Sequence, residues 1–495
     1  MVRCIFEGLI KRYPHAYDLC QVGLAHSLAV TYPKWPVHLI MTTKDNNGNS
    51  QRPPGAWLVP DALRNVVLRF HPEIVFALDA PAGVAPLCYA PAYLPSTNDE
   101  WNGFYDNVAP LDPADRPYKL ILYLRISGLP LPSQVGPILN RADLIVTMSE
   151  WARSGLLRCC PSIPSDKIEV TYSPADTARF VPLLESERKE ARRALLPDWM
   201  PQDAFLVGWV GLPRWRKQVW LLYKVIHYLR TGRYLVCSDC GRVSLFDRDP
   251  MARCHLNQPN GVLEARPGYK FDVCARCQSD NVHPADPLQD VFLWLHMPKD
   301  DPLSDWPVNW LEHEYGLEEN KDIYYTQGCG AKAALAPDDM PTLYQLWDCL
   351  LYLSGAGSFG LPAWEAMCSA LPVVYTDYSS HAEFLGAGRA GLAVEGVLQP
   401  EGKAGLWRSI GDVAQAVAAV RLLYYDRDLG RELGSNGRAF VQQYDLDVQA
   451  QKWHRVFQRL RLTHSFQQRI EPTINSKEST PATRTTEVVN VNEGV

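Results

Sequence analysis

One stretch, which runs from residue 348 to Glu395, constrains the fold of this chain more than any other. It opens with an apolar strand, Asp348–Leu353, and continues into a loop, Ser354–Pro362, that contains three glycines. The proline that ends the loop suits the first turn of a helix, which we predict over Ala363–Ala370. A second apolar strand, Val373–Tyr375, follows. Strand, glycine loop, helix and strand in this order predict a parallel α/β sheet, with an anion site where the loop meets the helix.

Four segments of this stretch resemble the donor-site signature of the retaining, family-four type glycosyltransferases of the GT-B fold, the glycosyl transferases group 1. They are Ser358-Phe359-Gly360-Leu361-Pro362, Glu365-Ala366-Met367, Leu371-Pro372-Val373-Val374 and Glu383. The resemblance implies an α/β fold of the GT-B type, with two Rossmann-like doubly wound domains that face a cleft. It also implies a nucleoside diphosphate sugar as the partner of the second domain.

The resemblance implies a role for each matched position. The backbone after Phe359 would contact sugar and phosphate, Glu365 would hold the ribose, and Glu383 would support the loop or contact the donor. Where the family carries another Glu, eight positions before Glu365, this chain has Gly357. The donor-binding candidates in this stretch are Gly357, Ser358, Phe359, Gly360, Leu361, Glu365 and Glu383.

Cationic residues follow an earlier strand. The strand Leu206–Val210 leads into a loop with Arg216 and Lys217, and this position resembles the family's Arg and Lys pair that neutralises the donor diphosphate. Fixed cations can stabilise a leaving diphosphate, so we expect catalysis to require no metal. From charge alone, a solvated loop face is the alternative interpretation. No catalytic residue is identified.

Two Cys-x-x-Cys pairs, Cys237/Cys240 and Cys274/Cys277, lie where the family would proceed directly to its next strand. Each pair can place two thiolates on one tetrahedral ion, so the segment predicts a zinc ribbon with a structural Zn²⁺. The interval between the pairs is longer than usual and contains Cys254 and His255 as spare ligands. The module is a candidate surface for a protein or a nucleic acid.

Composition limits the class of protein. The chain of 495 residues has a formal charge of -6 and 46% hydrophobic residues, which predicts a globular protein without an overall field for nucleic acid. We find no transmembrane segment and no secretory apolar core at the N-terminus, so we expect a cytoplasmic protein. In that setting its 13 cysteines are interpreted as thiols and metal ligands.

The predicted organisation follows the GT-B plan. The N-terminal acceptor domain would lack its first strand and glycine turn, because the chain begins with a helix, Met1–Tyr13. The predicted parts are an N-terminal Rossmann-like domain (1–181), a donor domain (182–445) with the zinc-ribbon insertion (234–282), a crossover helix (446–462) and a disordered tail (463–495).

Two functions remain open at this stage. The first is a glycosyltransferase that transfers a sugar, with retention of anomeric configuration, to an unknown acceptor: a glycan, lipid, protein or small molecule. The alternative is a catalytically impaired GT-B protein that binds a sugar nucleotide or acts as a zinc-ribbon scaffold, which Gly357 and the short N-terminus favour. The sequence leaves the donor base and sugar and the oligomeric state open.

Overall fold

The computed structural model of the chain describes residues 19–23, 37–41, 74–79, 118–131, 133, 135–245, 274, 276–301, 304–326, 339–401 and 405–462. The predicted helix at Met1–Tyr13, the missing first strand before it and the predicted tail lie outside these residues. The chain divides into two compact units, Met1–Pro174 with Tyr444–Val495, and Ala175–Gln443.

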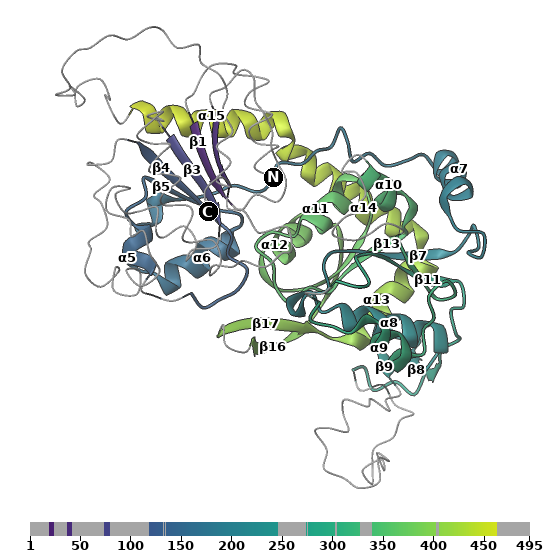
Figure 1. Cartoon of the computed structure of the whole chain (residues 1–495). Coiled ribbons are helices and arrows are strands. Elements are labelled where there is room, and N and C mark those ends of the chain that lie inside the picture. The colour runs from purple at the N-terminus through teal and green to yellow at the C-terminus, as the bar shows by residue number, and fades with distance from the viewer. Residues whose placement is uncertain are drawn as a thin grey trace, which may run out of the picture. The chain divides into compact units, whose positions relative to one another are not determined.

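The first unit is built on a parallel sheet of six described strands (Figure 1). Its order is β2-β1-β3-β4-β5-β6, and every neighbouring pair is parallel. Apolar runs such as the one in β4, which is buried on both faces, are typical of parallel sheets. The strands are β1 (Leu19–Gly23), β2 (Val37–Met41), β3 (Ile74–Asp79), β4 (Lys119–Leu124), β5 (Leu144–Thr147) and β6 (Ile168–Val170).

Helices α5 (Val135–Leu139), α6 (Glu150–Cys159) and α15 (Leu446–Leu462) belong to the same unit. Ser149 caps α6, because its Oγ accepts a hydrogen bond from Ala152 N at 3.1 Å. From α15, Trp453 packs with its ring centroid 5.3 Å from that of Phe76 and 5.6 Å from that of Tyr123. The last helix therefore completes the core over this sheet.

The second unit holds a parallel sheet in the order β12-β11-β7-β13-β14-β15. Counted along the chain this is the 3-2-1-4-5-6 order of dinucleotide-binding folds. The chain adds strands to one side of β7 and then returns to place β13 on its other side, so the switch point lies between β7 and β13. The strands are β7 (Phe205–Val210), β11 (Val291–His296), β12 (Ile323–Tyr325), β13 (Cys349–Tyr352), β14 (Val373–Thr376) and β15 (Gly391–Val394).

Helices cover this sheet (Figure 1). The helix predicted over Ala363–Ala370 begins two residues earlier in the structure and ends at Cys368. The helices of the unit are α7 (Glu185–Leu195), α8 (Val219–Thr231), α9 (Val308–Tyr315), α10 (Met340–Leu346), α11 (Leu361–Cys368), α12 (Ser379–Ala387), α13 (Val413–Tyr425) and α14 (Arg427–Val441).

One hairpin was not predicted from the sequence. Strands β16 (Gly396–Glu401) and β17 (Leu406–Gly411) pair antiparallel. The next helix begins at Val413, and Asp412 caps it by accepting a hydrogen bond from Gln415 N at 2.8 Å.

The inserted segment contributes a small antiparallel sheet. Strands β8 (Tyr234–Cys237), β9 (Val243–Leu245) and β10 (Val282–Pro284) lie in the order β10-β8-β9. Ala285 N donates a hydrogen bond to Tyr234 O at 3.0 Å. The two ends of the inserted segment therefore lie next to each other in the second unit. The spare ligands proposed at positions 254 and 255 lie outside the described residues.

Candidate functional site

The two segments expected to bind the donor meet at the switch point. Arg216 and Lys217 follow β7, and the glycine loop follows β13, which pairs with β7. Gly355 N donates a hydrogen bond to Arg216 O at 2.8 Å. The cationic turn and the glycine loop are therefore joined directly through their backbones.

The Lys217 side chain contacts the end of the strand that precedes the glycine loop. Its Nζ donates a hydrogen bond to the Tyr352 hydroxyl at 2.9 Å and lies 4.9 Å from the centroid of the same ring. Tyr352 is the last residue of β13, so its hydroxyl lies beside the start of the loop. Sequence reasoning assigned no function to Tyr352, because a tyrosine in a buried strand carries no signal of its own.

Strand β17 holds the glycine loop from another direction. Ser409 N donates to Gly355 O at 3.0 Å, and Gln218 Nε2 donates to Ser409 O at 2.7 Å. Gln218 is buried, with a left-handed backbone at φ 48° immediately before α8. The loop, the cationic turn and the hairpin thus form one hydrogen-bonded assembly, and the sequence analysis missed the hairpin's part in it.

The loop ends where α11 begins, and Gly360 makes that transition possible. Its φ is 117°, and a Cβ there would lie 2.9 Å from the Cβ of His381. Phe359 is buried and packs against Trp364 and Phe384, with centroids 5.0 and 4.8 Å away. The Phe359 side chain therefore anchors the loop, while the backbone that follows it presents the first N–H groups of α11.

Glu365 lies in α11 and is tied to α10. The Tyr344 hydroxyl donates a hydrogen bond to Glu365 Oε2 at 2.7 Å. Burial raises the pKa of Glu365, and the hydrogen bond from Tyr344 works in the opposite direction. The hydrogen bond fixes the orientation of the carboxylate expected to hold a ribose.

Gly357 lies against polar groups and no side chain fills its place. A Cβ there would meet nothing closer than the Tyr352 hydroxyl at 3.9 Å and His381 Nδ1 at 4.0 Å. Its N–H donates to Ser379 Oγ at 3.2 Å. Ser379 adopts a left-handed conformation at φ 66°, which is rare for a residue other than glycine and is a form of strain that clusters at functional sites.

His381 stays neutral in this setting. Its Nδ1 contacts Ser379 Oγ at 3.1 Å and its Nε2 contacts Thr376 O at 3.1 Å. Burial, aided by the charge of Lys217, lowers the pKa of His381 to about 3. His381 therefore acts as a fixed hydrogen-bonding group at neutral pH.

The remaining predicted donor residues lie on the same elements. Ser358 is half-buried in the loop, and Leu361, at the first position of α11, is 38% exposed. Glu383 is half-buried on α12, one turn after Ser379. The described contacts join the cationic turn to the glycine loop.

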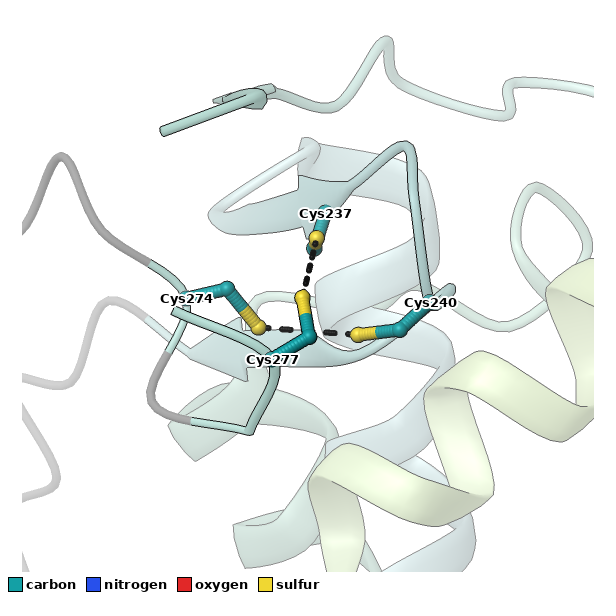
Figure 2. Close-up of side chains that lie close together, drawn as sticks. All are labelled: Cys237, Cys240, Cys274 and Cys277. Carbon is teal, nitrogen blue, oxygen red and sulfur yellow. Dashed lines mark hydrogen bonds between the residues drawn. The ribbon is translucent and has the colours of Figure 1, made fainter. Parts of the chain in front are cut away.

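The four predicted metal ligands do come together. The sulfur atoms of Cys237, Cys240, Cys274 and Cys277 all lie within 4.8 Å of one another (Figure 2). The shortest separations are 3.6 Å between Cys237 and Cys277 and 3.5 Å between Cys240 and Cys274. Four sulfurs from two knuckles around a common centre are the donor set of a structural zinc site.

The two knuckles have the same backbone hydrogen bonds. Gly241 N donates to Cys237 O at 2.8 Å, and Gln278 N donates to Cys274 O at 2.9 Å. Both Gly241 and Gln278 have left-handed backbones, at φ 70° and 60°. The N–H groups of Cys277 and Arg276 lower the pKa of Cys274 to about 6, so this sulfur is prepared to bind as a thiolate.

No helix of the described residues is long and apolar enough to cross a membrane.

Comparison with known proteins agrees with this geometry. The sequence model of the family "Glycosyl transferases group 1" matches residues 332–440, which span the glycine loop and α11. The chain has the GT-B fold, and residues 332–440 match the glycosyl transferases group 1 model. The match runs from before α10 to α14 and does not include the cationic turn.

Solved structures similar to this chain cover nearly its whole length. Sucrose-phosphate synthase from Thermosynechococcus elongatus has a TM-score of 0.59 at 13% identity, over 90% of this chain and 100% of the other. Anabaena Alr3699/HepE, in complex with UDP and glucose, has a TM-score of 0.54 at 14% identity, over 92% and 95%.

WaaG, a glycosyltransferase involved in lipopolysaccharide biosynthesis, has a TM-score of 0.51 at 12% identity, over 92% of this chain and 94% of the other. At such identities the likeness establishes the GT-B fold. No curated protein matches the sequence of this chain.

Proposed function

We propose that the chain binds a nucleoside diphosphate sugar in its second unit and transfers the sugar to an acceptor with retention of anomeric configuration. The observation that carries this proposal is the bond between Gly355 N and Arg216 O, which holds the cationic turn beside the glycine loop. The diphosphate would lie between Arg216, Lys217 and the first N–H groups of α11.

The proposed reaction uses fixed charges. The bond between C1 of the sugar and the diphosphate oxygen breaks, and a bond from C1 to the acceptor oxygen forms on the same face. The acceptor's proton passes to the departing diphosphate, so the step needs no protein base. Arg216, Lys217 and the start of α11 stabilise the charge that develops on the leaving group, and they do so without a metal ion.

Glu365 is proposed to bind the ribose hydroxyls. Its hydrogen bond from Tyr344, 2.7 Å long, restricts the carboxylate before any ligand arrives. Such preorganisation lowers the entropy lost on binding. Uridine is the base to test first, because Anabaena Alr3699/HepE was solved with UDP and with UDP-glucose.

Isothermal titration calorimetry with uridine, guanosine and adenosine diphosphate sugars tests the proposal. We expect Arg216→Ala to weaken binding of the preferred donor about tenfold to a hundredfold, since a charge-assisted contact to phosphate is removed. Arg233→Ala is the matched control, because Arg233 is an exposed arginine of the same unit outside the loop. No heat from any sugar nucleotide, or equal loss in both variants, would contradict the proposal.

A sugar-nucleotide-binding protein without turnover is the second candidate function. It is favoured by Gly357, where no side chain occupies the position of the family's additional carboxylate. Release of nucleoside diphosphate from a bound donor distinguishes the two candidate functions. A chain that binds a donor tightly but releases no nucleoside diphosphate, with water or with an acceptor panel, would support the second.

We also propose that the four cysteines bind Zn²⁺ as a closed structural site. Support comes from the tetrad of sulfurs and from the matching hydrogen bonds of its two knuckles. Thiolate ligands agree with a reducing compartment such as the cytoplasm. The module offers a surface for a protein or a nucleic acid, and a filter-binding assay on the full chain tests the latter.

A further inference from the structure

A large hollow lies on the edge of the second sheet opposite the candidate donor site. It has a volume of about 890 Å³ and is lined by α7, α14 and the residues that begin three strands. Phe205 begins β7, Asp348 precedes β13, and Pro372 precedes β14, whereas the cationic turn and the glycine loop follow the ends of β7 and β13. The hollow is therefore separate from the donor site.

Helix α7 turns a cationic face toward the hollow. Arg188, Lys189, Arg192 and Arg193 all line it, and their spacing of one, three and four residues places them on one side of the helix. Glu185 is the one acidic residue of α7 that lines the hollow beside these four cations.

Helix α14 turns a second cationic face toward the same hollow. Arg427, Arg431 and Arg438 recur at intervals of four and seven residues, and all three line it. With the acids Glu185, Asp203 and Asp348, the lining has seven cations against three anions, a net charge of +4. The whole chain has a formal charge of -6, so the charge of the lining is opposite in sign to that of the chain.

One carboxylate at the floor serves three of these arginines. Asp348 forms ion pairs with Arg188 at 2.9 Å, Arg192 at 2.7 Å and Arg427 at 3.1 Å. Two positive charges therefore stay uncompensated in the cluster. Burial lowers the pKa of Arg192, and the neighbouring cations Arg188 and Arg427 lower it further.

Some of these arginines have a purely structural use. Arg188 and Arg192 bind the carbonyls of the turn before β13, and Arg438 binds carbonyls near the start of α7 and the end of α11. That use does not require Arg193 or Arg431. Arg193 is exposed and makes no ion pair with any described residue. Arg431 is 70% exposed and forms a surface ion pair with Asp428, which is 89% exposed.

We propose that this hollow binds a phosphate-bearing anion at a site distinct from the donor site. Guanidinium groups from two helices converge on a space of the size that small-molecule ligands occupy, and arginine forks match phosphate oxygens. Arg193 and Arg431 are the cations available to the ligand, while Asp348 keeps the arginines at the floor in place.

Calorimetric titration of the full chain with inorganic tripolyphosphate tests this site. Every chain carries Arg216→Ala and Lys217→Ala, so that the candidate donor site contributes no phosphate binding. We expect Arg193→Ala with Arg431→Ala to weaken binding about tenfold or more. Arg455→Ala with Arg459→Ala, which removes two exposed helical arginines of the other unit, should leave the affinity unchanged.

No binding of tripolyphosphate to the parent chain overturns the proposal. The same affinity in the Arg193→Ala, Arg431→Ala variant and in the control also overturns it. Arg193→Glu provides a second, single change at an exposed position, and it should weaken binding in the same direction. Sedimentation with phosphatidylcholine vesicles, with and without phosphatidic acid, separates the sources of the phosphate. Binding to phosphatidic acid that Arg193→Glu abolishes identifies a lipid head group, and binding to tripolyphosphate alone identifies a free ligand.

Discussion

At the scale of single residues, Gly357 is the position where this chain departs from the donor motif that it resembles. The groups around it are the Tyr352 hydroxyl and a neutral His381, and Lys217 donates a hydrogen bond to that hydroxyl. A cation therefore lies near the position where the motif would have a Glu. A carboxylate placed here would have room for its Cβ and a cation nearby.

We expect Gly357→Glu to tighten the binding of UDP-glucose about tenfold, because a carboxylate can accept hydrogen bonds from sugar hydroxyls. Gly357→Gln is the matched control, since it adds nearly the same volume without the charge. Titration calorimetry on both variants and the parent chain gives the comparison. Weaker binding by the Glu variant than by the Gln variant would count against a sugar at this position.

At the scale of elements, one acidic residue, Asp348, forms ion pairs that link α7 to the sheet. Asp348 also accepts a hydrogen bond from Leu206 N at 2.7 Å, so the same carboxylate links β7, α7 and α14. Burial raises the pKa of Asp348, but Arg188, Arg192 and Arg427 outweigh burial, and the pKa lies below its usual value. Ionised Asp348 is thus the stable form in the folded chain.

We expect Asp348→Asn to destabilise the second unit by about 3 kcal/mol, because three arginines lose their counter-charge. A carboxyl with a depressed pKa stabilises the fold above its unfolded value near 3.9, and that contribution disappears as the pH falls through its lower folded value. Urea unfolding at pH 7 and pH 3 measures both effects. Asp203→Asn, an exposed change, should alter neither.

At the scale of the whole molecule, the cysteine knuckles differ from the rest of the second unit in what stabilises them. The large apolar core around β7 and α8 includes Tyr234, Val236 and Val243 of the module, but none of its four cysteines. The strands of the module are short, so a metal would supply much of the stability of the knuckles. Loss of metal should therefore affect the knuckles first.

We expect purified chain to contain one zinc ion, measured by mass spectrometry, and Cys277→Ser to lose most of it. Chelation should lower the melting temperature of the wild type and leave that of Cys277→Ser unchanged. Cys159→Ser, which alters a cysteine of the first unit, should retain the metal. Iron in place of zinc, or metal retained by Cys277→Ser, would show the zinc assignment to be wrong.

Much of this molecule could be predicted from local patterns. Apolar runs located β7, β13 and β14, and the spacing of the four cysteines predicted their convergence. The hairpin β16–β17 escaped prediction, because Gly396–Glu401 is almost wholly exposed and lacks an apolar strand pattern.

Other features depend on contacts that spacing does not reveal. Asp348 and its partner Arg188 lie 160 positions apart, so nothing local connects them. Ser379 offers only a Ser-Ser pair after a strand as a signal, although its hydroxyl accepts the Gly357 N–H. The donor loop was found through its motif, while the groups that hold it required coordinates.

The hydrogen bond that closes the insertion, from Ala285 N to Tyr234 O, has an evolutionary consequence. Because the two ends of the excursion touch, a gene could acquire or discard the codons between them while α8 and β11 kept their places. A short linker in place of the thiol-bearing segment should therefore leave the second sheet intact.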